Sequence, residues 1–262
     1  MEKLTQLEES IYNKGERLIP GVTHDIMQLI LHRSSYMFFR KVIEKDFELS
    51  NKAWNSINIL DLGCGVGHGC YTLAALEKSN VVGTDNSNES LEYAKCNYAR
   101  NNIKYQLAKL EEFIPIMPEY DYVTSRGVFE HIANGLQLAQ STKWKYRLLF
   151  DVPYDEPYGR NKHHVLYGIR EEDFSEFPNA ELFYQDLSGV IYDIRTKPSF
   201  PNMIICICSH PSLYKVSELI KFPIPAWSPG LLFDLRKRTR TYMGDIKKFA
   251  QSYIRIARNF MK

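Results

Sequence analysis

Short apolar runs alternate with segments of helical spacing along the central part of the chain. The runs predict strands at 57–62, 80–85, 103–107, 120–125 and 146–152. Apolar residues recur at helical spacing at 24–47, 70–78 and 87–100, and Ser87 or Asn86 is available as the N-cap of the last segment. Strands that alternate with helices of this length predict parallel strands joined by crossover helices.

The rhythm changes after residue 180, where two strand-like runs follow each other without a helix between them. They occupy 182–193 and 203–209, and the turn-rich segment TKPSFPN between them predicts an antiparallel hairpin at the edge of the sheet. We expect the second strand of this hairpin to lie beside the fifth parallel strand. The chain is therefore predicted to be an α/β protein with a seven-stranded, mostly parallel sheet.

Composition adds limits on the class of protein. Hydrophobic residues make up 44% of the 262 residues and charged residues 24%, which excludes a wholly disordered or fibrous chain. The five cysteines form no CxxC pair, so we expect reduced thiols rather than disulfides or a zinc site. The N-terminus lacks the apolar region of a signal peptide, and no apolar run approaches the roughly 20 residues of a membrane-spanning helix. These features predict a cytoplasmic protein.

Charge is unevenly distributed, although the formal net charge is only +2. Residues 236–262 carry nine Lys or Arg and one acidic residue, with helical spacing of apolar residues from 245 onward. Three interpretations of this basic segment stay open: a solvated helix on the core, a peripheral contact with a membrane, or a contact with a nucleotide diphosphate or a partner subunit, as in a homodimer. Because the rest of the chain is net acidic, we expect no nucleic acid partner.

The segment 59–67, ILDLGCGVG, carries the strongest functional signal. Gly63, Gly65 and Gly67 follow the first predicted strand, where a backbone without side chains can turn sharply and approach a ligand. Asp85 stands twenty residues after Gly65, at the end of the second predicted strand. A carboxylate at that position can accept hydrogen bonds from both hydroxyls of a ribose. The pattern predicts a cofactor that contains a nucleoside.

The glycine spacing argues against a nicotinamide dinucleotide, because His68 stands where the G-x-G-x-x-G fingerprint needs its last glycine. The pattern D-x-G-x-G-x-G instead resembles motif I of the class I S-adenosylmethionine-dependent methyltransferases, as do VVGTDNS and YDYVTSRGVFEHI further along. The resemblance covers about residues 50–210 and implies a Rossmann-like fold, S-adenosyl-L-methionine as donor and S-adenosyl-L-homocysteine as product. Many members place an acidic residue after the third strand, whereas here Leu110 is expected to stack on the adenine.

The resemblance also implies roles for individual residues around the donor. Those matched to the family's cofactor contacts are Asp61, Gly63, Cys64, Gly65, Asp85, Asn86, Leu110, Ser125 and Arg126. Asp61 would orient the ammonium group of the donor, and Asp85 would hold its ribose. Asn86 would lie against the adenine edge, and Ser125 and Arg126 would border the sulfonium. Local capping is the alternative for Asn86 and Ser125.

Candidate catalytic residues follow the fourth and fifth predicted strands. Glu130 and His131 resemble a pair found in many class I enzymes, and in the ubiquinone-pathway O-methyltransferases this region binds a divalent metal. Those enzymes have a further glutamate where this chain has Gly127, so we expect no resident metal. The alternative is that Glu130 caps its helix and His131 makes a structural hydrogen bond. His164, in the loop after the fifth strand, is the preferred general base because imidazole titrates near neutral pH.

The loop 152–164, VPYDEPYGRNKHH, is long, polar and aromatic, as is typical of substrate-binding loops at the carboxyl ends of parallel strands. Its candidate substrate-binding residues are Tyr154, Asp155, Arg160, Asn161 and His163.

The N-terminal segment 15–21, GERLIPG, resembles the GERF-x-P opening of bacterial methyltransferases of sugar and surface-polysaccharide pathways. In such enzymes this segment folds over the cofactor, so Arg17 would meet the cofactor carboxylate and Tyr12 would help to close the lid. A helix held by a surface ion pair is the alternative. The implied organisation is a helical lid segment at 1–50, a methyltransferase domain at 51–210 and a basic helical extension at 211–262.

These expectations combine into one prediction and two alternatives. The prediction is an O-methyltransferase that acts on a sugar, nucleotide-activated and destined for capsule or lipopolysaccharide. The first alternative is an N- or O-methyltransferase of another small molecule or lipid precursor. The second is an inactive cofactor-binding scaffold.

Overall fold

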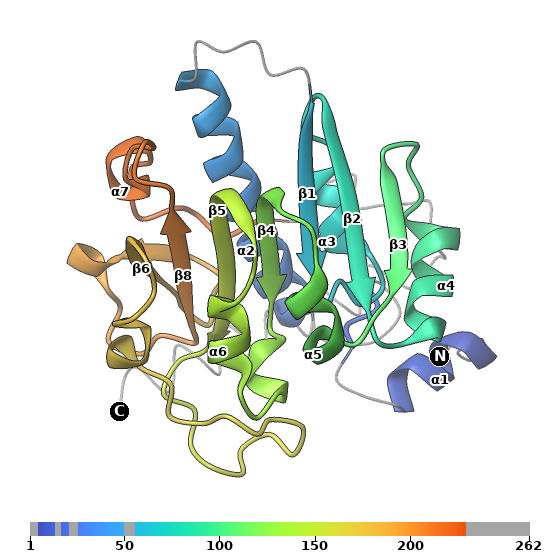
Figure 1. Ribbon diagram of the computed structural model, residues 1–262. Coiled ribbons are helices and arrows are strands. Elements are labelled where there is room, and N and C mark those ends of the chain that lie inside the picture. Colours follow the sequence, from blue (N-terminus) through green and yellow to red (C-terminus); the bar gives the residue numbers. More distant parts are fainter. Residues whose placement is uncertain (1–4, 14–16, 21–25, 50–55, 229–262) are drawn as a thin grey trace.

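A computed structural model describes residues 5–13, 17–20, 26–49 and 56–228 (Figure 1). These residues form one eight-stranded sheet with the strand order β3-β2-β1-β4-β5-β8-β6-β7. The strands are β1 Ile57–Leu62, β2 Ser79–Asp85, β3 Ile103–Leu107, β4 Tyr120–Arg126, β5 Trp144–Pro153, β6 Ala180–Gln185, β7 Ile191–Asp193 and β8 Met203–Ser209. The first five are parallel, whereas β8 is antiparallel to both β5 and β6. The mostly parallel α/β fold and the place of β8 beside β5 were both predicted from the apolar pattern.

The helices within the described residues connect and cover these strands. The α-helices are α1 Gln6–Asn13, α2 Ile26–Leu49, α3 His68–Leu73, α4 Asn88–Asn97, α5 Leu110–Phe113, α6 Gly135–Gln140 and α7 Val216–Leu219. The 3-10 helices are η1 Ile114–Ile116, η2 Phe129–His131, η3 Glu171–Phe174 and η4 Ile194–Thr196. None of these helices is both long enough and apolar enough to span a bilayer.

The sheet has one strand more than the seven predicted, because a turn divides the run at 182–193. The carboxylate of Asp186 accepts hydrogen bonds from the backbone N–H groups of Ser188 and Val190, and Gly189 adopts a φ of 89°. This turn folds β7 back onto β6 as an antiparallel strand. Alternation of apolar residues continues through the turn, so the pattern alone indicated a single strand.

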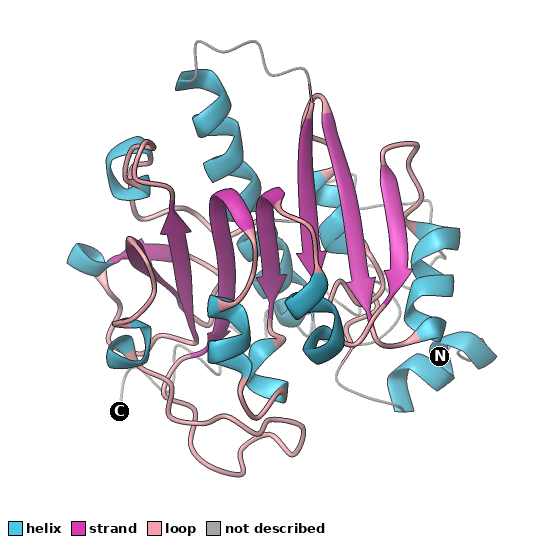
Figure 2. Ribbon diagram, in the orientation of Figure 1, coloured by secondary structure: helices cyan, strands magenta, loops and turns pink. Residues whose placement is uncertain are grey.

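Two apolar layers cover the two faces of the sheet, and neighbouring residues of one strand point into different layers. Ile59 packs with α2, α3 and α4, whereas Leu60 packs with α5 and α6. Figure 1 shows α2 and α3 behind the sheet and α5 and α6 in front of it. Figure 2 shows the loop after β5 extending beyond the carboxyl ends of the parallel strands. The faces are therefore closed, and the open edge for a ligand lies at those strand ends.

The helix α2 is part of the core, although the sequence placed it within a lid segment at 1–50. Phe39, Val42 and Ile43 of this helix are completely buried in the apolar layer behind the sheet. Asp46, near the end of α2, receives two hydrogen bonds from the guanidinium of Arg147 on β5, at 2.7 and 2.6 Å. Both side chains are buried, so this ion pair joins the helix to the middle of the sheet.

Several predicted features lie outside the described residues. They include the basic segment at 236–262 and Gly15 of the GERLIPG motif. The three interpretations of the basic segment, the homodimer among them, stay predictions.

Removing the acidic partner of Arg147 is expected to destabilise the fold. Asp46→Asn leaves a buried guanidinium without its counter-charge, which lowers the free energy of unfolding by about 3–5 kcal/mol. Urea denaturation measures the loss. Glu44→Gln is the matched control on the same helix, because its ion pair with Arg40 is partly exposed and contributes below about 1 kcal/mol. Similar small losses in both variants would contradict a structural role for the buried pair.

Candidate active site

The loop between β1 and α3 forms the floor of a cavity because its glycines bend the backbone away from the strand. Gly63 and Gly65 have φ values of 67° and 53°, in the left-handed region that side chains disfavour. A Cβ on Gly63 would lie 2.4 Å from a methyl carbon of Val128, whereas a Cβ on Gly65 would project into open space. A ligand can therefore lie directly against the backbone at Gly65.

This cavity has a volume of about 330 Å³ and collects most of the predicted cofactor residues. Those that line it are Arg17, Gly63, Cys64, Gly65, Asp85, Asn86, Leu110 and Arg126. Asp61, Ser125 and Tyr12 do not line it. Glu111 also lines the cavity, next to Leu110. An acidic residue is thus present after β3, although the sequence suggested that Glu111 lies too far along the chain for this role.

Asp85 is held rigidly at the end of β2. One of its carboxylate oxygens accepts a hydrogen bond from the backbone N–H of Gly65 at 2.9 Å, and the other accepts from Ser87 at 2.8 Å. Ser87 is also the N-cap of α4, because its hydroxyl accepts from the N–H of Ser90. Asn86 is therefore not the cap, and its side chain lines the cavity.

Arg17 lies beside Asp85 and not at the predicted carboxylate end of the cofactor. Its guanidinium donates to Asn86 at 2.7 Å and to Asp85 at 3.3 Å. The attraction between a buried carboxylate and a guanidinium explains this position. In the structure Arg17 therefore belongs to the side of the cavity where a ribose is expected.

Asp61 lies beneath the cavity wall, covered by Tyr36 of α2. The hydroxyl of Tyr36 lies 3.2 Å from both carboxylate oxygens, and the hydroxyl of Thr124 donates to one of them at 2.7 Å. Burial raises the pKa of Asp61 to about 6. Tyr36, and not Asp61, therefore lines the cavity where the resemblance implied a contact between Asp61 and the ammonium group of a ligand.

Ser125 is also turned away from the cavity. It is fully buried, and its hydroxyl donates to the carbonyl oxygen of Leu62 on the neighbouring strand at 3.1 Å. The structure therefore gives Ser125 an inter-strand role at the position where the resemblance implied a contact with the sulfonium.

The other side of the cavity is formed by residues that the sequence analysis missed. His32 and Tyr36 come from one face of α2, and His68 begins α3. The Nη1 of Arg126 lies 2.8 Å from the Nε2 of His32, so the imidazole accepts a hydrogen bond there. Two signals pointed to these residues: the i,i+4 spacing of His32 and Tyr36, and the place of His68 directly after the third glycine.

A second and larger cavity, of about 1140 Å³, adjoins the first. The two share wall residues, namely His32, Arg126, Gly127, His131 and His163. All the predicted substrate-binding residues line the second cavity: Tyr154, Asp155, Arg160, Asn161 and His163. Tyr12 lines it too, so the structure places this residue on the acceptor side rather than over the cofactor cavity.

Two of these residues hold the loop in shape. The hydroxyl of Tyr154 donates to Glu171 at 3.2 Å and accepts from the ammonium of Lys197 at 2.8 Å. Asp155 accepts from Arg170 at 2.7 Å. These contacts join the start of the loop that carries the histidines to residues 170 and 171, which follow it in the chain.

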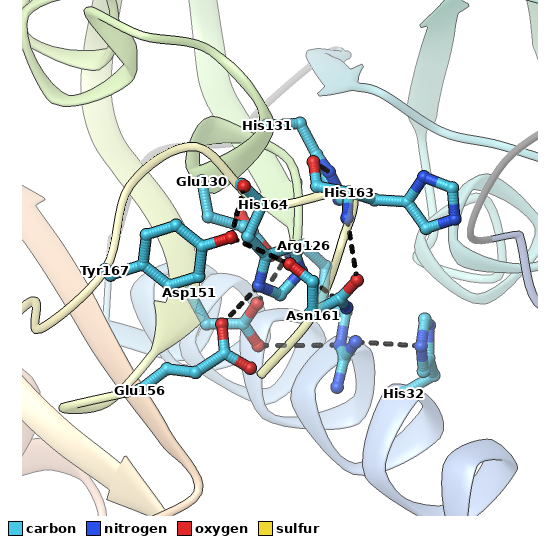
Figure 3. Close-up of polar contacts among 11 residues, drawn as sticks. His32, Arg126, Glu130, His131, Asp151, Glu156, Asn161, His163, His164 and Tyr167 are labelled. Atoms are coloured by element: carbon cyan, nitrogen blue, oxygen red, sulfur yellow. Dashed lines mark hydrogen bonds and ion pairs between the residues drawn. The ribbon is translucent and has the colours of Figure 1, made fainter. Parts of the chain in front are cut away.

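His164 lies at the centre of a polar network in the wall of the second cavity (Figure 3). Its Nδ1 forms a short hydrogen bond with the carboxylate of Glu156, and its Nε2 lies 3.1 Å from the side-chain amide of Asn161. A carboxylate only accepts, so Nδ1 carries the proton and Nε2 keeps its lone pair. Glu156 was not singled out in the sequence, because eight residues of irregular loop separate it from His164.

Glu130 and His131 lie next to His164 but have different surroundings. Glu130 is buried, and burial raises its carboxyl pKa to about 8. Its carbonyl oxygen accepts from the backbone N–H groups of Val165 and Leu166 at 2.9 and 3.1 Å. The Nδ1 of His131 lies 2.9 Å from the carbonyl oxygen of His163. His131 therefore makes the structural hydrogen bond of the alternative, whereas Glu130 does not cap its helix and contacts the histidine loop through its backbone carbonyl.

Glu130, His131 and His164 each offer a ligand atom, and these atoms lie within 4.8 Å of one another. One carboxylate and two imidazoles are a donor set that suits a divalent transition metal. Both ring nitrogens of His164 already have protein partners, however, and Gly127 adds no carboxylate. The arrangement favours proton transfer at His164 over metal binding.

A change of pH should reveal the buried Asp61 in the ligand-free protein. Its folded-state pKa of about 6 lies above the unfolded value of 3.8, so its contribution to stability is full below pH 3.8 and declines as the pH rises toward 6. Compared with Asp61→Asn, the wild type should lose about 1–3 kcal/mol of unfolding free energy across this interval. Urea titrations at pH 3.5 and 7.5 measure the difference. A pH-independent difference would contradict the raised pKa.

Comparisons with known proteins agree with this geometry. Residues 55–143 match a family model described as a methyltransferase domain. The ubiquinone biosynthesis O-methyltransferase of Mesorhizobium japonicum is 32% identical over 85 residues, which are 32% of this chain and 34% of that protein. The enzyme of the same name from Rickettsia akari is 33% identical over 107 residues, 40% of this chain and 42% of that protein. The chain thus spans about a third to two fifths of the length of these relatives.

Solved structures share the fold at low sequence identity. The CurJ carbon methyltransferase has a TM-score of 0.52 at 14% identity, over 70% of this chain and 57% of that chain. The methyltransferase domain of bacterial CtHen1 scores 0.50 at 18% identity, over 69% of this chain and 100% of that chain. Monomeric WbdD has a TM-score of 0.50 at 16% identity, over 77% of this chain and 48% of that chain. The family match therefore supports a methyltransferase domain, and the solved structures show that the chain shares their fold.

Proposed function

We propose that the chain transfers a methyl group from S-adenosylmethionine to a hydroxyl of a sugar, nucleotide-activated and used in capsule or lipopolysaccharide synthesis. The observation that carries this proposal is the pair of adjoining cavities with His164 in the wall of the second. The first cavity has the size and lining for a nucleoside. The second has a candidate base and a polar wall for an acceptor.

The residues of the first cavity fit the proposed donor. The open space above Gly65 admits a ligand, and the rigid carboxylate of Asp85 can accept hydrogen bonds from ribose hydroxyls if Arg17 yields its place. Leu110 provides an apolar surface for a base, and Glu111 lies beside it. When bound, the sulfonium supplies an activated methyl group, so the protein must mainly position the acceptor and remove its proton.

His164 suits the role of general base. Glu156 holds the imidazole in the tautomer that leaves the Nε2 lone pair available, as a carboxylate does in other catalytic histidine pairs. Asn161 occupies that lone pair in the structure, and an acceptor hydroxyl would take its place. His164 is 8% exposed, so a proton taken up there is shielded from bulk water.

The polar lining of the second cavity supports a nucleotide sugar. Arg160 and Lys162 bring two positive charges to its wall, which suits a diphosphate. Asn161 and His163 add groups that hydrogen-bond hydroxyls.

A specific observation favours a second candidate, a phenolic or lipid-linked acceptor. Tyr12, Leu187 and Phe200 line the same cavity and are 47%, 42% and 67% exposed. The relatives named as ubiquinone biosynthesis O-methyltransferases agree with an acceptor of this kind. This candidate keeps the same donor and the same base.

A panel of acceptors distinguishes the two candidates. Purified protein with S-adenosylmethionine should form S-adenosylhomocysteine, measured by liquid chromatography, when nucleotide sugars are supplied. Turnover of catechols or prenylated phenols alone would favour the second candidate. No product with any acceptor would support the remaining alternative, a cofactor-binding scaffold.

Substitution of the proposed base should lower turnover more than binding. His164→Ala is expected to reduce turnover by roughly 10²- to 10⁴-fold. Glu156→Gln should act in the same direction because Nδ1 loses its anionic acceptor. His210→Ala is the matched control, since His210 is exposed and its imidazole forms hydrogen bonds with Ser212. Turnover retained in His164→Ala would overturn the assignment of the base.

A further inference from the structure

His68 is a buried imidazole without a hydrogen-bond partner. It lines the first cavity and is 5% exposed, yet neither ring nitrogen has a partner among the described residues. Burial, together with the charges of Arg33 and Arg126, lowers its pKa to about 3. His68 is therefore neutral, with one N–H to donate. A polar group buried without a partner is costly, which indicates that a ligand satisfies it.

Two guanidinium groups beside His68 are also incompletely satisfied. The buried Nε atoms of Arg33 and Arg126 have no hydrogen-bond partner among the described residues. The guanidinium of Arg33 instead lies over the ring of Trp227, 5.3 Å from its centre. Asp151 lies 3.7 Å from Arg126, and the buried carboxyl of Glu130 also interacts with Arg126. Within the described part of the chain, the imidazole N–H of His68 and the Nε–H groups of the two arginines are thus unused donors.

The unused donors lie on the side of the cavity that is remote from the ribose position. Asp85 ends β2 and Arg126 ends β4, and these strands flank β1 on opposite sides. The ring of His68 lies 5.6 Å from the ring of His32 on α2, and His32 in turn accepts a hydrogen bond from Arg126 at the end of β4. A ligand with its ribose at Asp85 and its body over Gly65 would extend toward these donors.

We propose that His68, together with Arg126 and the charge of Arg33, binds the carboxylate of the amino-acid part of the donor. The inference rests on the proposed function and names the residues that recognise one end of its cofactor. A carboxylate supplies the acceptors that the imidazole N–H and the guanidinium groups lack, and its charge attracts the guanidinium of Arg126. Arg17, which the sequence suggested for this role, lies with Asp85 instead.

Two ligands that differ only at that end test the proposal. S-adenosylhomocysteine carries the amino-acid part, and 5′-methylthioadenosine lacks it. In calorimetric titrations, His68→Phe should weaken binding of S-adenosylhomocysteine by about 10- to 100-fold, the effect of losing a hydrogen bond to a charged group. Affinity for 5′-methylthioadenosine should change by less than about twofold, because no contact to the adenosyl part is lost.

Matched variants separate recognition from damage to the fold. Asp85→Ala should weaken both ligands in parallel, and His210→Phe should weaken neither. Arg33→Met is a second test of the assignment, because it should also lower the affinity for S-adenosylhomocysteine and leave that for 5′-methylthioadenosine unchanged. His68→Phe should also raise the Tm of the ligand-free protein, because an unsatisfied polar ring is replaced by an apolar one. A purely structural histidine would instead lower the Tm when replaced.

The titrations distinguish failure of the carboxylate assignment from failure of the proposed methyltransferase function. If wild-type protein binds neither ligand, the methyltransferase proposal itself fails. If it binds both and His68→Phe weakens them equally, or weakens neither, the carboxylate assignment is overturned. Selective loss of S-adenosylhomocysteine affinity supports the assignment.

Discussion

The position of α2 against the sheet is the constraint on which the candidate site depends. The bidentate bond from Arg147 to Asp46 fixes the end of this helix, and its apolar face is buried along the strands. Toward its beginning the same helix contacts two buried acids, since Ser35 donates to Asp151 at 2.6 Å and Tyr36 contacts Asp61. Residues at the carboxyl ends of β1 and β5 are thereby tied to one rigid element. A helix fixed by so many buried polar contacts can position a ligand with little reorganisation.

The site is electrostatically divided by the glycine loop. Asp85 provides negative charge on the β2 side, and Arg126 provides positive charge on the β4 side, with the charge of Arg33 also acting on His68. A ligand with hydroxyls at one end and a carboxylate at the other matches this division. The neutral state of His68 and the elevated pKa of Asp61 have one cause, because the wall between the two sides is buried and disfavours charge.

The two cavities meet where β4 and β5 end, and this junction explains why candidate catalytic residues come from a loop. The long segment after β5 places His164 and Glu156 beside the shared wall, and Glu130 anchors it through backbone hydrogen bonds. Tyr154 and Lys197 fasten the same segment to the far edge of the sheet. The strand ends thus frame the first cavity, while an anchored loop lines the second, a division common in open α/β sheets.

The sequence by itself determined the α/β class, the strands at 57–62 and 103–107, and the glycine loop with Asp85, because these features depend on local periodicity and on backbone conformations that few residues adopt. It did not determine the eighth strand, the buried place of Asp61 and Ser125, the position of Arg17, or the pairing of His164 with Glu156. Those depend on which side chains from distant segments meet at the strand ends. Only tertiary packing decides such contacts, because the partners of a buried polar group are set by the elements that cover it and not by its neighbours in the chain.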